Sequence, residues 1–154
     1  MPEPLAINTR IIEGLYCEAL VLADEVRSAF TLSGRLDEAS AENDLTRVAL
    51  SCEALRTTTR MMHAVAWLLN HRAYLAGDLS ELQLRRHGQL APESEPSDPE
   101  RQAMLDPEVR ELVIATERFH ARLRRLDHVW RQPERPAATA LVRLRDRVER
   151  RLRG

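Results

Sequence analysis

The sequence predicts an all-α protein: an antiparallel three-helix bundle with long helices, a flexible acidic loop and a basic C-terminal tail. Three long segments place their apolar residues in alternating steps of three and four, the spacing of one face of an α-helix. Polar connections separate these segments, and the 154 residues include only 5 glycines. The length suits one compact domain, which we assign to residues 1–132, followed by a tail at residues 133–154.

The first helix is expected at about residues 9–32, beginning near Asn8 or Thr9. The run Ser33-Gly34-Arg35 is expected to end it, and a short polar connection then leads to an antiparallel neighbour. Its apolar stripe consists of Ile12, Leu15, Ala19, Leu22, Val26 and Ala29.

The second helix is expected at about residues 41–76, with Gly77 as the residue that ends it. At about 1.5 Å per residue it would be roughly 50 Å long. We expect its stripe in three-four steps to face the core. The members of this stripe are Leu45, Val48, Cys52, Leu55, Thr59, Met62, Ala66, Leu69, Ala73 and Ala76.

The segment at about residues 88–105 is predicted as a flexible acidic loop, because Pro92, Pro96 and Pro99 cannot continue a helix and their neighbours are too polar to bury. A weaker helical turn is indicated before it, within residues 78–86. The third helix is expected at about residues 107–131, with Asp106 as its cap and Pro107 in its first turn. Its stripe consists of Val109, Leu112, Thr116, Phe119, Leu123, Leu126 and Trp130.

The tail at residues 133–154 is basic and carries one apolar side. It forms either a short amphipathic helix or a segment that becomes ordered only on a partner. Residues 118–154 contain 12 arginines and 4 acidic residues, a formal charge of +8, so the rest of the chain sums to −9 against a total of −1. An acidic body with a basic end suggests a protein that binds other macromolecules. The apolar side consists of Leu141, Leu144, Val148 and Leu152.

No catalytic or metal-binding pattern is found, so we expect neither an enzyme nor a cofactor. Glu117 and His120 have the Glu-x-x-His spacing of di-iron bundles, but the pair occurs once where such sites use it twice. Cys17 and Cys52 lack C-x-x-C spacing and are expected to be buried and reduced. The chain shows neither a signal peptide nor an apolar run of the ~20 residues that cross a bilayer, so we expect a cytoplasmic protein that binds no membrane.

One stretch of the second helix, Thr59–Asn70, is apolar on nearly every side. In a three-helix bundle each helix meets only two neighbours, so part of such a helix stays open. We therefore predict that a second molecule covers this stretch, most simply in a symmetric homodimer. The alternative is that the segment after Gly77 folds back as a lid. The predicted dimer or cargo interface consists of Met61, Val65, Trp67, Leu68, Tyr74 and Leu75.

Two segments carry a resemblance to a known family. Residues 50–73 read LSCEALRTTTRMMHAVAWLLNHRA, and residues 14–27 read GLYCEALVLADEVR. The first resembles the signature helix, and the second the N-terminal helix, of the RcdA-like family, the regulators of CtrA degradation in alphaproteobacteria. Together the two segments and their surroundings cover about half of the chain.

The resemblance implies a non-catalytic adaptor in regulated proteolysis during the cell cycle. Members of that family are dimeric three-helix bundles that act with the ClpX unfoldase of the ClpXP protease, primed by the CpdR response regulator. They deliver cargo transcription regulators or a cyclic-di-GMP-binding co-adaptor. On this chain the tail would contact the protease machinery through Leu141, Arg143, Arg145, Arg147, Arg150 and Arg151.

The alternative function is a helical bundle whose basic tail binds nucleic acid, or a structural dimeric scaffold. Positive charge alone gives salt-sensitive, unspecific attraction to phosphates. Asp146 and Glu149 interrupt the arginines, and no aromatic residue follows Trp130 for stacking on bases. These features argue against nucleic acid as a partner.

Overall fold

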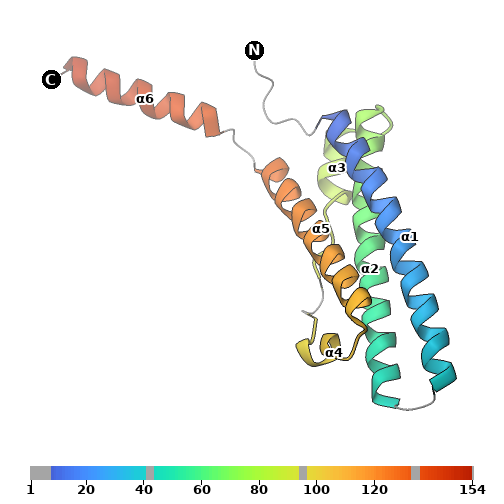
Figure 1. The fold of residues 1–154 in the computed structure, drawn as a ribbon. Helices are drawn as coiled ribbons and strands as arrows, with labels where there is room; N and C mark the ends of the chain where they lie inside the picture. The colour runs from blue at the N-terminus through green and yellow to red at the C-terminus, as the bar shows by residue number, and fades with distance from the viewer. Residues whose placement is uncertain (1–7, 41–43, 94–96, 133–135, 154) are drawn as a thin grey trace.

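The computed structural model describes residues 8–40, 44–93, 97–132 and 136–153, with side chains at all of these positions except 33–40 and 136–140. Every regular element in these ranges is a helix, which confirms the all-α prediction. Three long helices lie side by side as a bundle (Figure 1). The elements are α1 (Thr9–Ser40), α2 (Asp44–Leu75), α3 (Glu81–His87), α4 (Pro99–Ala103), α5 (Pro107–Arg131) and α6 (Pro136–Arg153).

Helix α1 is longer than the sequence indicated. It continues through Ser33, Gly34 and Arg35 to Ser40, so the predicted end at residue 32 is wrong. A glycine inside a helix costs only about 1 kcal/mol relative to alanine. One such residue does not end a helix unless the backbone also turns there.

Helix α2 ends where the sequence predicted. Gly77 adopts a φ of 86°, a left-handed conformation that residues with a Cβ adopt only at a cost. The Gly77 amide donates to the Tyr74 carbonyl at 3.1 Å, and the Asp78 amide donates to the Ala73 carbonyl at 2.8 Å. These two bonds form a Schellman motif, which satisfies the carbonyls that the helix end leaves without partners.

The segment that follows is packed against the bundle in the residues that the structure describes, and it includes the short helix α4 within residues 88–105, where the sequence predicted a flexible loop. Ser80 and Gln83 form a capping box that starts α3. Leu84, Leu90 and Leu105 are buried. In the sequence, α4 lies between Leu90 and Leu105. The prolines do prevent a long helix here, but these leucines anchor the segment to the bundle.

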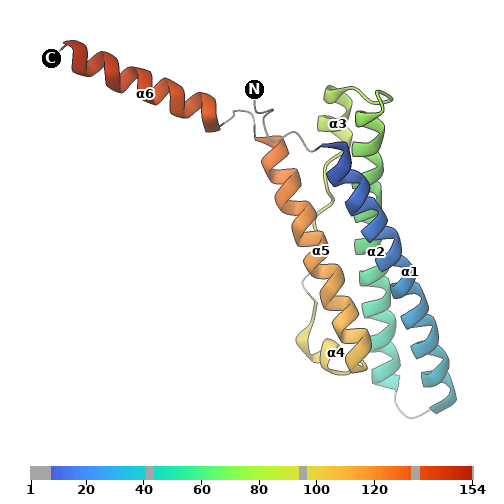
Figure 2. The ribbon, with the colours of Figure 1, turned by 45° about the horizontal axis from the view of Figure 1, so that its top comes forward.

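Helices α5 and α6 have different surroundings. Helix α5 keeps the predicted bounds and packs on both α1 and α2. The tail is helical, and Figures 1 and 2 show α6 lying apart from the three long helices. Within the described ranges, no helix combines the length and the hydropathy that a bilayer crossing requires.

The orientation of α2 about its own axis is the main departure from the sequence-based prediction. The stripe expected to face the core instead faces solvent, with Leu55 70% and Met62 65% exposed. The side that faces inward carries several polar residues, so apolar character did not identify it. The buried residues of α2 are Ala49, Glu53, Thr57, Arg60, Met61, Ala64, Trp67, Leu68 and His71.

Candidate functional site

The six residues predicted to form an interface lie mostly inside the protomer. Met61, Trp67 and Leu68 are buried, with at most 3% of each exposed, so the prediction that a second molecule covers these three is wrong. Val65 and Leu75 are partly buried and pack against the same core cluster, and Tyr74 is also partly buried. The neighbouring elements of the same chain therefore cover Met61, Trp67 and Leu68.

Trp67 shows how α5 contributes to that cover. The indole Nε1 donates to Asp127 Oδ1 at 2.9 Å, and Arg131 Nε donates to the same oxygen at 2.9 Å. His71 lies one turn further along α2, with its ring centroid 4.0 Å from that of Trp67. Burial lowers the pKa of His71 to about 4, so the imidazole is neutral at pH 7.

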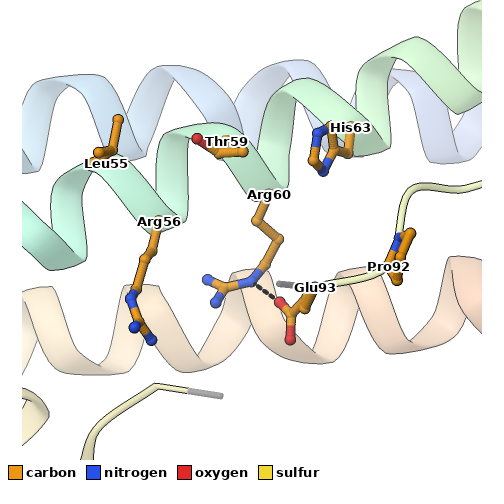
Figure 3. A pocket seen from close by; sticks show the side chains of 7 residues that line it. All are labelled: Leu55, Arg56, Thr59, Arg60, His63, Pro92 and Glu93. Atoms are coloured by element: carbon orange, nitrogen blue, oxygen red, sulfur yellow. Dashed lines mark hydrogen bonds and ion pairs between the residues drawn. The ribbon is translucent and has the colours of Figure 1, made fainter. Parts of the chain in front are cut away.

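The segment after Gly77 covers another side of α2, in agreement with the lid alternative. Leu90 belongs to the same core cluster as Met61, Trp67 and Leu68. Next to it, Arg60 donates a charge-assisted hydrogen bond to Glu93, which Figure 3 shows as a dashed line. These contacts fasten the segment to the middle of α2.

Arg60 is a structural residue and not a free anion-binding group. It is 4% exposed, its Nη1 donates to Thr116 Oγ1 at 2.9 Å, and its Nη2 lies 3.7 Å from Glu117 Oε1. A pocket of about 260 Å³ lies beside it. These partners occupy the guanidinium, and the pocket lies between α2 and the covering segment. It is lined by Leu55, Arg56, Thr59, Arg60, His63, Pro92 and Glu93.

A row of exposed apolar residues runs along α2, and we call it the α2 stripe; one member, Leu55, also lines the pocket beside Arg60. The stripe consists of Leu45, Val48, Leu55, Met62 and Leu69, each between 44% and 70% exposed. From Val48 onward these residues recur every seven positions, the period of the seam in a coiled coil, where it packs against another helix. The prediction that this stripe faces the core of the protomer is therefore wrong for these five residues.

A groove between α1 and α2 continues this stripe and has a volume of about 580 Å³. Val26 and Met61 are its buried members, and Met62 and Leu69 connect it with the α2 stripe. Such an apolar groove between two helices is suited to a further helix. The full lining is Ala23, Val26, Arg27, Phe30, Thr31, Thr58, Met61, Met62, Val65, Ala66 and Leu69.

The remaining candidates for chemistry have structural surroundings. Glu117 accepts a hydrogen bond from Gln102 at 3.0 Å, and burial lowers the pKa of His120. Among the described residues, no group of three His, Cys, Asp or Glu could hold a metal ion. Both cysteines are free thiols, but Cys17 is exposed and Cys52 half-buried, so the prediction that both are buried is wrong.

The residues predicted to contact the protease machinery all lie on α6 and are exposed. Arg145 lies 3.9 Å from Asp146 and 3.7 Å from Glu149, and Arg150 Nε donates to the Asp146 carbonyl. The others are Leu141, Arg143, Arg147 and Arg151. The structure does not bring any of them to the α2 stripe.

Comparison with known proteins gives a match to a family model described as "Protein of unknown function (DUF1465)". Neither the curated proteins nor the solved structures include a match to this chain. The model matches residues 5–152, which include the helices described above except the last residue of α6, Arg153. The chain therefore belongs to the DUF1465 family.

Proposed function

We propose that this protein is a non-catalytic adaptor that delivers cargo proteins, such as cell-cycle transcription regulators, to the primed ClpXP protease. The resemblance of residues 14–27 and 50–73 to the RcdA-like family supports the choice of protease. The observation that carries the proposal is the α2 stripe. A single protomer leaves this packing surface open, as an adaptor that binds other proteins requires.

The exposed area on the α2 stripe is of the right size for reversible association. Burying a Leu, Met or Val side chain fully contributes about 1.5–3 kcal/mol. Scaled by the exposed fractions of Val48, Leu55, Met62 and Leu69, this gives about 3–7 kcal/mol for one protomer. A symmetric dimer would gain about twice as much, against a cost of association of about 4–15 kcal/mol. The net free energy of association is therefore small, which suits partners that bind reversibly.

In this proposal the α2 stripe and helix α6 bind different partners. The α2 stripe and the adjacent groove bind a second copy or a cargo protein, including a cyclic-di-GMP-binding co-adaptor. The arginines of α6 face the ClpX unfoldase primed by a CpdR-like response regulator. Their charge would accelerate encounter with an acidic surface and would be sensitive to salt.

The test is a reconstituted degradation assay with ClpX, ClpP, the response regulator and a cargo regulator. The protein should accelerate ATP-driven degradation of the cargo. Met62→Arg should reduce this acceleration at least tenfold, because it places a charge in the apolar stripe. Val21→Arg is the control, since Val21 is 61% exposed but lies on the side of α1 away from the groove. Equal activity of both variants would refute the assignment to the α2 stripe, and no acceleration by the wild type would refute the adaptor function.

A second candidate, binding of nucleic acid through α6, is suggested by the exposed arginines on that helix. It predicts a mobility shift of duplex DNA or RNA whose affinity falls steeply with salt. Two of the arginines already interact with Asp146 or Glu149, which weakens this alternative. The degradation assay and the mobility shift distinguish the two functions directly.

A further inference from the structure

Helix α6 carries an apolar stripe that faces solvent along its whole length. Its four large members are each at least half exposed and follow one another in steps of three or four. The ribbon views show α6 lying apart from the bundle (Figures 1 and 2). An amphipathic helix of 18 residues is suited to packing its apolar side into a groove. The stripe consists of Leu141, Leu144, Val148 and Leu152.

The groove between α1 and α2 matches this stripe in length and character. Along α2 the groove extends from Thr58 to Leu69. The α6 stripe extends from Leu141 to Leu152, the same number of residues, which is about 17 Å at ~1.5 Å per residue. A helix placed there would lie against α1 and α2 as the fourth helix of a bundle.

The groove faces away from α5, the helix that precedes α6. Arg60 and Trp67 bond to α5, whereas Met62 lies on the groove. Two residues along a helix correspond to a rotation of about 200°, so Arg60 and Met62 point in nearly opposite directions. The groove and α5 therefore lie on opposite faces of the α1–α2 pair.

The connection between α5 and α6 would have to be almost fully extended for α6 to reach the groove of its own protomer as a complete helix. From Arg131 to Pro136 the chain makes five Cα–Cα steps, which span at most about 18 Å. Packed helix axes are separated by about 8–10 Å, and the path around the α1–α2 pair to the opposite face requires about twice that distance. A helix that projects from the bundle can instead reach a neighbouring molecule.

We propose that the groove between α1 and α2 of one protomer holds the apolar stripe of α6 from a second copy, in a reciprocal exchange. Such an exchange closes as a two-fold dimer. The inference rests on the self-association included in the proposed function. Arg143, Arg147 and Arg150 lie on the opposite side of α6 and stay in solvent, available to the protease machinery. Of the residues assigned to that contact, Leu141 alone is part of the stripe.

The first test makes the same substitution, valine to arginine, at two positions on α6. Val148 belongs to the stripe and Val142 does not, yet both are 50% exposed. Arginine has a higher helix propensity than valine, so neither change should unfold α6. In sedimentation of the full chain, Val148→Arg should raise the dimer dissociation constant at least tenfold, and Val142→Arg should leave it near the wild-type value. Equal dimerisation of both variants would overturn the proposal.

The second test identifies the occupant of the groove. In a background of Cys17→Ser and Cys52→Ser, one chain carries Val148→Cys and a second, size-tagged chain carries Met62→Cys. A short bismaleimide should join these two chains into a mixed dimer, and Val142→Cys should give at least tenfold less product. A chain that carries both cysteines and cross-links only within itself would overturn the exchange, as would the absence of any product. The cross-link needs no protease, so a failed exchange is distinguishable from a failed adaptor function.

Discussion

The burial of Trp67 gives the sharpest prediction about stability. Trp67 is 2% exposed, and its indole donates to Asp127 from within the core. Replacing a buried Trp with Ala costs about 3–5 kcal/mol, from lost burial and from the cavity that remains. A domain of this size has a total stability of about 5–15 kcal/mol. At about 2–4 °C per kcal/mol, Trp67→Ala should lower the melting temperature by roughly 6–20 °C.

The measurement is thermal unfolding followed by circular dichroism, with Met62→Ala as the control. Met62 is 65% exposed, so its truncation should change stability by no more than about 0.5 kcal/mol. The effect of Trp67→Ala should persist at low protein concentration, because the contacts lie within one protomer. If the Trp67→Ala protein kept its melting temperature but became monomeric, the burial of Trp67 within one protomer would be refuted. Trp67 would then belong to an interface between protomers.

Two further predictions concern His71 and Gly77. The pKa of His71 is about 4 in the folded chain against 6.5 in the unfolded one, so the unfolded chain binds a proton first as the pH falls. The folded state should thus lose up to about 3 kcal/mol between pH 7.5 and pH 4. The loss should be smaller in His71→Gln, as measured by the urea midpoint; the same acid sensitivity in both proteins would contradict it. Gly77→Ala should destabilise by about 1–2 kcal/mol because φ is 86° there. Gly14→Ala, in a helix with open space around the new Cβ, should be neutral or stabilising, and equal effects of the two changes would contradict the argument.

Much of the secondary structure could be predicted because its signals are local. The start of α5 was predictable because the φ of Pro107 is fixed near the helical value. The end of α2 was predictable because Gly77 can adopt a positive φ. The end of α1 was not predictable in this way, since Gly34 stays within the helix. The sequence did not predict whether the tail is helical on its own, because an amphipathic pattern does not indicate whether a segment is ordered without a partner.

The sequence by itself determined that α2 has an apolar stripe in three-four steps and that the chain around it is helical. Only the tertiary structure decided which side of α2 faces inward. Polar groups can be buried when distant residues satisfy them, and here Ser97 donates to Glu53 at 2.9 Å and Asp127 accepts from Trp67. These partners lie 44 and 60 residues away along the chain, so no local pattern contains them. The inward face of α2 therefore followed from pairing across the fold, and its most regular apolar stripe stayed exposed to solvent.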